Sequence, residues 1–224
     1  MSHDETDQAP RPEPRRPAAH PVFSRIYPHI ARAGEKGGAT EHRRALLAGL
    51  HGRVIEVGAG HGVNFAYYPS TVTEVVAVEP EAHLRELAQT AAERAGVKIR
   101  ITAGIAETLP APDGEFDAAV ASLVLCSVPE QSVALGEIHR VLRDQGELRF
   151  YEHVIARKPS TARIQRALDA TIYPFLTGGC HCARDTAAAI ARAGFEIEHQ
   201  EQIAFKPSPL APTIPHILGT ARRT

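Results

Sequence analysis

Residues 54–69 read VIEVGAGHGVNFAYYP and place three alternating glycines directly after a short apolar run. The run predicts a buried strand. Gly58, Gly60 and Gly62 predict a tight loop in which the backbone can approach a ligand closely. A dinucleotide-binding loop has the spacing G-x-G-x-x-G, which would require glycine at the position of Val63. The loop therefore departs from that pattern.

Two carboxylates around this loop indicate which ligand it holds. Glu56 lies two residues before the first glycine, where it would repel a pyrophosphate and attract an ammonium group. Glu79 ends the next predicted strand, where an acidic residue binds ribose hydroxyls in nucleotide-binding folds of this kind. A helix expected to begin near Gly62 would offer its N-terminal N–H groups to an anionic group. S-adenosylmethionine, which carries an amino acid and a nucleoside, fits this set; a dinucleotide or a turn without ligand is the alternative.

Strand-like and helix-like segments alternate along the chain. This alternation predicts an α/β fold with right-handed crossovers and a parallel sheet covered on both faces. The last two strand-like segments are adjacent and predict a C-terminal antiparallel hairpin. The expected strands are 53–57, 73–80, 97–102, 116–125, 146–154, 195–205 and 216–223, and the expected helices are 81–95, 130–143, 160–172 and 184–193.

The chain is expected to fold as a single domain over residues 22–224, preceded by a disordered proline-rich tail over residues 1–21. Two cap helices, 22–33 and 41–50, are predicted on either side of a flexible glycine-rich connection. The loop 174–186 gathers glycine, cysteine and histidine and is expected on the substrate side.

Composition narrows the class of protein. The 224 residues are 43% hydrophobic, enough for one core, and the formal net charge of −1 gives no basic field for nucleic acid. Three cysteines without a secretory segment predict a cytoplasmic protein rather than a disulfide scaffold. No apolar run approaches the roughly 18 to 20 residues of a spanning helix, so we expect no membrane anchor. The expected partner is a small molecule, and the expected state is a monomer or homodimer.

Five segments resemble, in order, the motifs of class I S-adenosylmethionine-dependent methyltransferases of the ubiquinone-biosynthesis type. They are VIEVGAGHG, VAVEP, GIAETLP, FDAAVASLVLCSV and HRVLRDQGELRF, within about residues 45–155. The resemblance implies a Rossmann-like three-layer sandwich with a seven-stranded sheet, S-adenosylmethionine as methyl donor and S-adenosylhomocysteine as product. One departure is Ile105, where many relatives have an aspartate that contacts adenine. The implied cofactor-binding residues are Glu56, Gly58, Gly60, Gly62, Asn64, Glu79, Pro80, Ala106, Glu107, Ser122 and Leu123.

Further segments are similar to methyltransferase-like proteins that methylate alkyl thiols in animal microsomes. They are GVNFAYYPS, SLVLCSV, YEHV, GCHCARDT and PHILGTARR, and the likeness extends over about residues 45–222. Those relatives begin with an apolar anchor, whereas this chain begins with a proline-rich stretch. The likeness implies methylation of a small-molecule thiol, such as an exogenous or secondary-metabolite dithiol. Oxygen, nitrogen or carbon of a quinone, phenol or lipid precursor is the alternative acceptor, and a cofactor-binding regulator without turnover is the other alternative.

His153 and Tyr27 are the candidate catalytic residues. His153 follows a predicted strand, and an imidazole suits proton transfer at neutral pH; orienting a loop is its alternative role. Tyr27 would position the substrate or the sulfonium, or belong to the core. Cys180-His181-Cys182 lacks the spacing of a structural zinc site, so no metal is expected there. The predicted acceptor pocket consists of Leu125, Cys126, Cys180, His181 and Arg184.

Overall fold

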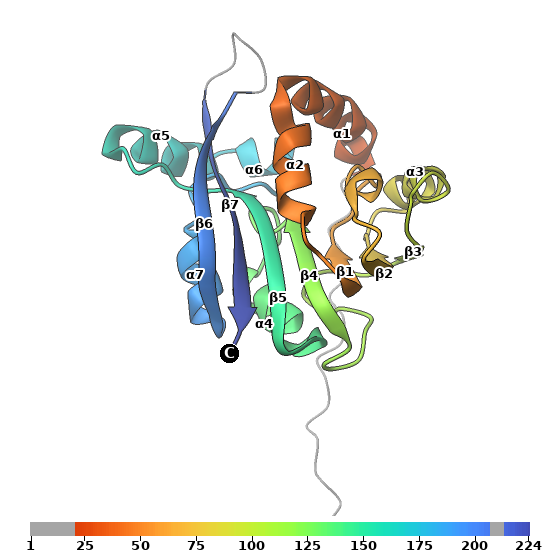
Figure 1. Ribbon diagram of the computed structural model, residues 1–224. Coiled ribbons are helices and arrows are strands. Elements are labelled where there is room, and N and C mark those ends of the chain that lie inside the picture. Colours follow the sequence, from red (N-terminus) through yellow and green to blue (C-terminus); the bar gives the residue numbers. More distant parts are fainter. Residues whose placement is uncertain (1–20, 207–212) are drawn as a thin grey trace, which may run out of the picture.

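A computed structural model describes residues 21–206 and 213–224 (Figure 1). The predicted tail over residues 1–21 lies outside these residues except for Pro21, which begins helix α1. The described residues form a seven-stranded sheet of order β3-β2-β1-β4-β5-β7-β6, in which only β7 runs antiparallel to its neighbours. The strands are β1 (Gly52–Val57), β2 (Val72–Val78), β3 (Ile99–Thr102), β4 (Phe116–Ser122), β5 (Leu142–His153), β6 (Phe195–Phe205) and β7 (Ile214–Arg223).

Helices cover both faces of the sheet, which confirms the predicted α/β sandwich with a C-terminal hairpin. One face packs against α4 and α7 through residues such as Leu135, Ile138 and Ile190. The other packs against α2 and α3 through residues such as Leu47 and Ala88. The helices are α1 (Pro21–Gly34), α2 (Thr40–Leu47), α3 (Ala82–Ala92), α4 (Gln131–Val141), α5 (Pro159–Asp169), α6 (Tyr173–Leu176) and α7 (Thr186–Arg192).

The helix expected after the glycine loop is wrong. Only a 3₁₀ turn, Phe65–Tyr67, lies between β1 and β2. The glycine turns occupy residues 58–62, so few residues of the segment 58–71 remain for a helix. Pro69 disfavours a further helical turn after Tyr67. The loop therefore offers a ligand its backbone and side chains, without a helix dipole.

The connection between the two cap helices also differs from the expected loop. A kinked turn, Glu35–Ala39, joins α1 to α2. Gly38 has a φ of 103° there, a conformation that glycine adopts at little cost. Glu35 accepts hydrogen bonds from Thr40 and from Arg43. These bonds tie the turn after α1 to the first residues of α2.

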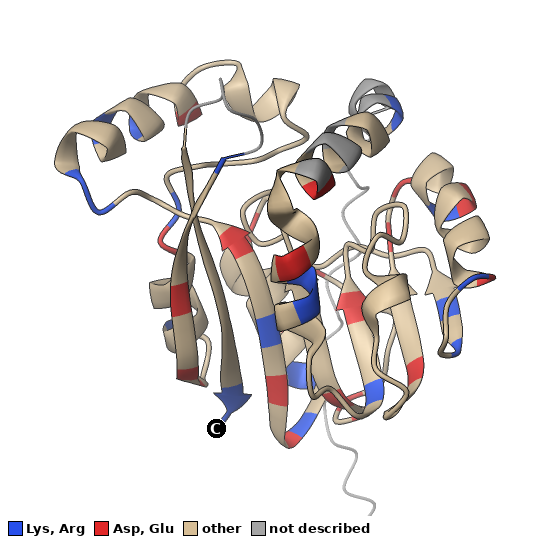
Figure 2. Ribbon diagram, turned by 45° about the horizontal axis from the view of Figure 1, so that its top comes forward, with Lys and Arg blue, Asp and Glu red and all other residues tan. Residues whose placement is uncertain are grey.

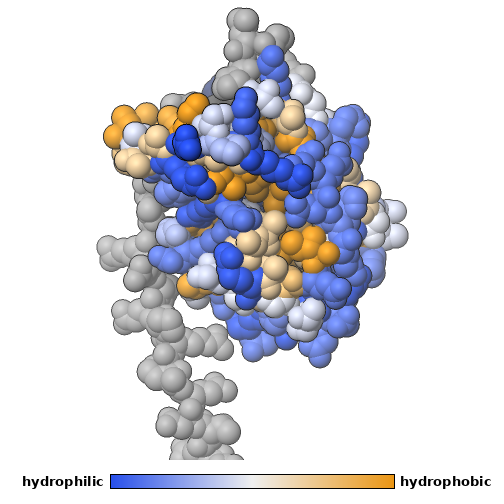
Figure 3. Space-filling view, turned by 90° about the vertical axis from the view of Figure 1, so that its left-hand side faces the viewer, coloured by the Kyte–Doolittle hydropathy of each residue, from blue (hydrophilic) through white to orange (hydrophobic). Residues whose placement is uncertain are grey.

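Helix α5 lies above the sheet, on the side away from α1, and α6 lies between α5 and α2 in this view (Figure 1). Apolar side chains appear among hydrophilic ones on the face that includes α5 (Figure 3). Among the described residues, no helix is both long and apolar enough to span a bilayer. The exposed apolar residues of the segment from α5 to α6 are Ile164, Leu168, Ile172, Phe175 and Leu176.

Candidate functional site

The carboxyl ends of β1 and β4 mark the point where the strand order reverses. In open α/β sheets, ligands bind at this point. Acidic residues lie near the ends of the central strands (Figure 2). Glu56, Glu79 and the loop 58–64 form what we call the carboxylate half of this edge. Cys126, His153 and the loop 174–186 form the thiol half.

Glu56 is buried at the end of β1, with 1% of its surface exposed. Its Oε1 accepts a 2.7 Å hydrogen bond from Asn64 Nδ2, and its Oε2 accepts a 2.8 Å bond from the Tyr68 hydroxyl. Burial raises the pKa of Glu56 to about 7, because desolvation outweighs these two bonds. A cationic ligand group beside this carboxylate would stabilise its charged form.

Glu79 follows β2 and is nearly as buried as Glu56. Its Oε2 accepts a 2.9 Å bond from the Gly60 N–H, and its Oε1 accepts a 2.9 Å bond from the Glu81 N–H. Burial raises the pKa of Glu79. Each oxygen retains a lone pair. The carboxylate can therefore accept hydrogen bonds from a pair of ligand hydroxyls while it holds the glycine loop.

The glycine loop packs closely against protein. Gly58 has a φ of 66°, and a Cβ there would meet Val124 at 2.4 Å. Gly60 has a φ of 58°, and a Cβ there would lie 3.2 Å from Tyr27. The loop is thereby wedged between α1 and the segment after β4. Tyr27 also meets His61 edge-on, with ring centroids 5.6 Å apart, so it borders the glycine loop, and its role toward the substrate or the sulfonium stays a prediction.

Arg43, which the sequence analysis did not identify, ties the cap helix to this edge. It comes from α2, is 3% exposed, and donates to Glu35 at 2.7 Å. Its Nη1 donates to Asn64 Oδ1 at 2.9 Å and to Ser122 Oγ at 3.2 Å. Asn64 thus links a cation to Glu56. In the sequence, Arg43 looks like one of several polar residues on a short helix, and no local pattern distinguishes it.

The remaining predicted cofactor residues lie along the same edge. Ala106 is buried in the core beside β3, and Glu107 follows it in the chain and is half-buried. The Pro80 carbonyl accepts a bond from Arg85. Leu123 has a φ of 59°, which is rare for a branched side chain, and its N–H donates to the Tyr151 carbonyl at 2.7 Å. Their contacts with a cofactor stay predictions.

Glu152 organises the segment after β4 and was also missed. It is fully buried in β5, and burial raises its pKa. Its Oε1 accepts 2.9 Å bonds from the N–H groups of Val124 and Leu125, and its Oε2 accepts a 3.0 Å bond from the Cys126 N–H. The carboxylate is therefore a structural anchor that fixes the position of Cys126.

Cys126, His153 and Cys180 come together from three distant segments. Parallel β4 and β5 bring the first two to the same edge, with Cys126 Sγ 3.9 Å from His153 Nδ1. Cys180 Sγ lies 3.1 Å from the same nitrogen. A hydrogen bond from Cys126 and the nearby His153 imidazole lower the pKa of the Cys180 thiol. The same interaction, together with burial, raises the pKa of Cys126.

The loop 174–186 is clamped onto the segment after β4. The His181 N–H donates to the Cys126 carbonyl at 2.8 Å, and Arg184 Nη1 donates to the Leu125 carbonyl at 2.7 Å. Arg184 is thus bonded to backbone through Nη1, and its expected role toward a substrate stays a prediction. Leu125 is fully buried in the core, and its expected place in the pocket wall stays a prediction.

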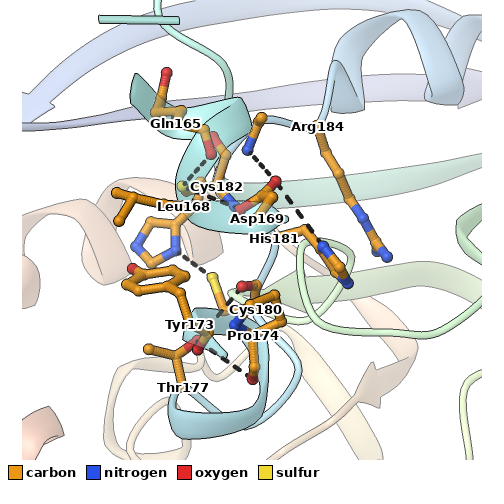
Figure 4. Close-up of polar contacts among 12 residues, drawn as sticks. Gln165, Leu168, Asp169, Tyr173, Pro174, Thr177, Cys180, His181, Cys182 and Arg184 are labelled. Atoms are coloured by element: carbon orange, nitrogen blue, oxygen red, sulfur yellow. Dashed lines mark hydrogen bonds and ion pairs between the residues drawn. The ribbon is translucent and has the colours of Figure 1, made fainter. Parts of the chain in front are cut away.

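Cys182 points away from Cys180 (Figure 4). Its thiol lies 3.3 Å from Asp169 Oδ1, and burial raises its pKa to about 12. His181 Nδ1 lies 3.9 Å from Asp169 Oδ2. The Cys-His-Cys sequence therefore does not converge on one point.

Comparison with known proteins decides the family. Residues 55–150 match the family described as a methyltransferase domain. Thiol S-methyltransferase TMT1B of mouse is 36% identical over 182 residues, which cover 78% of this chain and 73% of the mouse protein. This chain belongs to the class I S-adenosylmethionine-dependent methyltransferases.

Other relatives agree with this assignment. Human thiol S-methyltransferase TMT1A is 34% identical over 183 residues, which cover 78% of this methyltransferase and 73% of the human protein. The crystal structure of the YcgJ protein from Bacillus subtilis has a TM-score of 0.66 and 17% identity, covering 82% of this chain and 98% of that one. At that identity the structural likeness concerns the fold.

The carboxylate half has the hydrogen-bond acceptors that the methyltransferase cofactor requires. S-adenosylmethionine supplies a methyl group on a sulfonium, next to an amino-acid ammonium and a ribose. Glu79 retains lone pairs for the ribose hydroxyls, and Glu56 is the anion beneath the glycine loop. These residues fit the cofactor, with Glu79 expected on the ribose and Glu56 near the ammonium.

Aromatic rings surround the outer side of His153 in this methyltransferase. His216, from β7, meets His153 with ring centroids 4.3 Å apart and stacks on Tyr151 at 5.0 Å. Burial lowers the pKa of His216 to about 3, so its ring stays neutral. The His216 Nδ1–H donates to the Ile214 carbonyl at 2.9 Å. The sequence placed His216 in a strand, but only its pairing with β5 brings it to the site.

Proposed function

We propose that this methyltransferase transfers the methyl group of S-adenosylmethionine to the sulfur of a small-molecule thiol. The observation that carries the proposal is the chemistry of the thiol half. Two protein thiols and an imidazole lie together at the ends of β4 and β5. Mouse and human relatives named thiol S-methyltransferases, similar over 78% of this chain, support the same acceptor.

A thiol acceptor needs little help from the protein. A free thiol has a pKa near about 8.5, so a few per cent is already the nucleophilic thiolate at neutral pH. A phenol or carbon acid would require a stronger base. Glu152, the carboxylate nearest Cys126, already accepts three backbone N–H bonds and is buried. An imidazole remains beside the thiols, which suits sulfur better than oxygen or carbon.

The protein's part in the reaction is to align the two reactants and exclude water. In-line displacement is fast when the nucleophile is held behind the methyl group, since orientation accounts for much of the acceleration. Glu152 and Arg184 fix the segment after β4 through bonds to the N–H and the carbonyl of Leu125. This segment connects the carboxylate half to the thiol half.

The test is methyl transfer from S-adenosylmethionine labelled in its methyl group. The purified chain is incubated with dithiothreitol, with a phenol and with an alkyl amine, each in turn. The proposal predicts label in an S-methyl thioether, identified by mass spectrometry. Labelled product from only the phenol or the amine would overturn the thiol acceptor. S-adenosylhomocysteine binding without turnover on any acceptor would favour a regulator.

A further inference from the structure

The thiol half has the dimensions of a metal site. The ligand atoms of Cys126, His153 and Cys180 all lie within 4.8 Å of one another. In a tetrahedral zinc site, Zn–S and Zn–N bond lengths place neighbouring ligand atoms roughly 3.6 to 3.8 Å apart. The two nitrogen–sulfur separations, 3.1 and 3.9 Å, lie on either side of this range. Small movements of side chains would complete the geometry.

The backbone holds these three ligands in place. The bond from the His181 N–H to the Cys126 carbonyl fastens the Cys180 segment to the end of β4. Gly179 has a φ of 90°, and a Cβ there would lie 2.6 Å from the Ser127 carbonyl oxygen. Only glycine permits this approach, so the loop is built to lie against this segment. Preorganised ligands lower the cost of binding a metal.

The ligand set identifies the class of metal. Thiolate and imidazole favour zinc and other soft or borderline cations over magnesium and calcium. Within the part of the chain that the structure describes, this group contains three ligands and no fourth. Three protein ligands with an open position are typical of catalytic zinc, whereas structural zinc has four. Cys182 is excluded from the group because it pairs with Asp169.

We propose that Cys126, His153 and Cys180 bind a zinc ion whose fourth position receives the acceptor thiol. The second half of this statement rests on the proposed function. The acceptor releases its proton to solvent as its sulfur binds zinc. An electron pair of that sulfur then forms the bond to the methyl carbon while the sulfonium S–CH₃ bond breaks, leaving its pair on S-adenosylhomocysteine. The neutral thioether is a weaker ligand and leaves.

The first test measures the metal content of the full chain. The protein is purified under reducing conditions, supplied with zinc, freed of excess metal and analysed by inductively coupled plasma mass spectrometry. We expect one zinc per chain in the wild type and in Cys182→Ser, the matched control. We expect none in Cys180→Ser and His153→Gln. Zinc that is absent from the wild type, or lost equally from Cys182→Ser, would overturn the site.

The second test reports on the ligands directly. Cobalt bound in place of zinc should give thiolate-to-cobalt charge transfer in the near ultraviolet and tetrahedral d–d bands. Dithiothreitol should intensify the charge transfer, and a phenol should not. Thermal unfolding and S-adenosylhomocysteine binding of each variant show whether it is folded. A cobalt spectrum without thiolate bands, or a Cys126–Cys180 disulfide in the reduced preparation, would contradict the proposal.

Activity separates this site from the proposed function. Thiol methylation by metal-free protein at the full rate would overturn the role of zinc in binding the acceptor and leave the acceptor assignment standing. A zinc-loaded chain that methylates only phenols would overturn the thiol acceptor and leave zinc binding by the three residues standing.

Discussion

The two halves of the carboxyl edge hold their groups by different means. In the carboxylate half, Glu56 and Glu79 are buried among amide and hydroxyl donors from nearby residues. In the thiol half, Cys126, His153 and Cys180 come from three segments, and Glu152 holds the backbone that carries Cys126. The first arrangement suits a cationic ligand rich in hydroxyls, and the second suits a soft nucleophile.

This difference separates the effects of substitutions. Changes in the carboxylate half should act on the affinity for the methyl donor. Changes in the thiol half should act on turnover and on the acceptor. The segment after β4 touches both halves, because Val124 packs on Gly58 while Glu152 holds the Val124 N–H. Substitutions that affect this segment should have the largest effect on rate.

Glu152→Gln should cause the greatest loss of activity. An amide presents an NH₂ group to at least one of the three backbone donors, so the segment carrying Cys126 must move. A displacement of about 1 Å can cost about 100-fold in rate, and we expect kcat to fall by that order. Steady-state kinetics measure this change. Unchanged kcat would contradict the anchoring role.

Glu56→Gln should weaken the binding of the methyl donor more than the binding of the acceptor. A hydrogen bond to a charged group contributes about 1.5 to 3 kcal/mol, so the Kd of S-adenosylmethionine should rise roughly 10- to 100-fold at pH 8. Because the carboxyl pKa is about 7, wild-type affinity should also decline below that pH, and the variant should not show this decline. Titration calorimetry at pH 6 and 8 checks both. Parallel pH profiles would count against a Glu56–ammonium contact.

The same substitution should stabilise the protein without its cofactor. The folded pKa of Glu56, about 7, lies above the value near 4.3 of an unfolded chain, so wild-type stability is lost as pH rises through this interval. Removing the charge should therefore raise the free energy of unfolding by up to about 3 kcal/mol at pH 8, and by little at pH 5. Urea denaturation at the two pH values measures the difference. A variant that is less stable than the wild type at pH 8 would show that burial of the Glu56 charge does not destabilise the protein.

Cys182→Ser should have the smallest effect. The serine hydroxyl can donate to Asp169 as the thiol does. Cys182 lies outside the group formed by Cys126, His153 and Cys180. We expect kcat and both KM values to change by less than about twofold. Kinetics of this variant beside Cys180→Ser compare two cysteines separated by one residue. Equal losses from both would mean that loop packing, rather than this group of three residues, controls activity.

The sequence predicted the carboxylate half better than the thiol half for a physical reason. Glu56 and Gly58–Gly62 are contiguous, and parallel strands bring Glu79 to the same edge, so local spacing is enough. The absence of a helix after β1 depends on how few residues lie between the glycine turns and β2, and the glycine pattern does not show this. Cys180 reaches Cys126 through a loop clamped by backbone bonds, and sequence spacing does not show such bonds.

Residues that act through tertiary contacts were the hardest to predict. Arg43 and Glu152 are charged groups on a helix and a strand, and their roles appear only when their partners are known. His216 was expected in a strand, but its neighbours depend on the antiparallel pairing of β7 with β5. Leu125 is buried in the core and Arg184 binds a backbone carbonyl, and the sequence pattern shows neither contact.

The central claim is that the carboxylate half holds the methyl donor and the thiol half holds the acceptor. Comparing Glu79→Gln with Cys180→Ser, with S-adenosylmethionine and dithiothreitol varied independently, tests it most directly. The claim predicts that Glu79→Gln raises the KM of the donor about tenfold and leaves that of the thiol unchanged. Cys180→Ser should lower kcat/KM for the thiol and keep S-adenosylhomocysteine affinity. If Cys180→Ser weakens the binding of S-adenosylhomocysteine as much as Glu79→Gln does, the assignment of donor and acceptor to separate halves is contradicted.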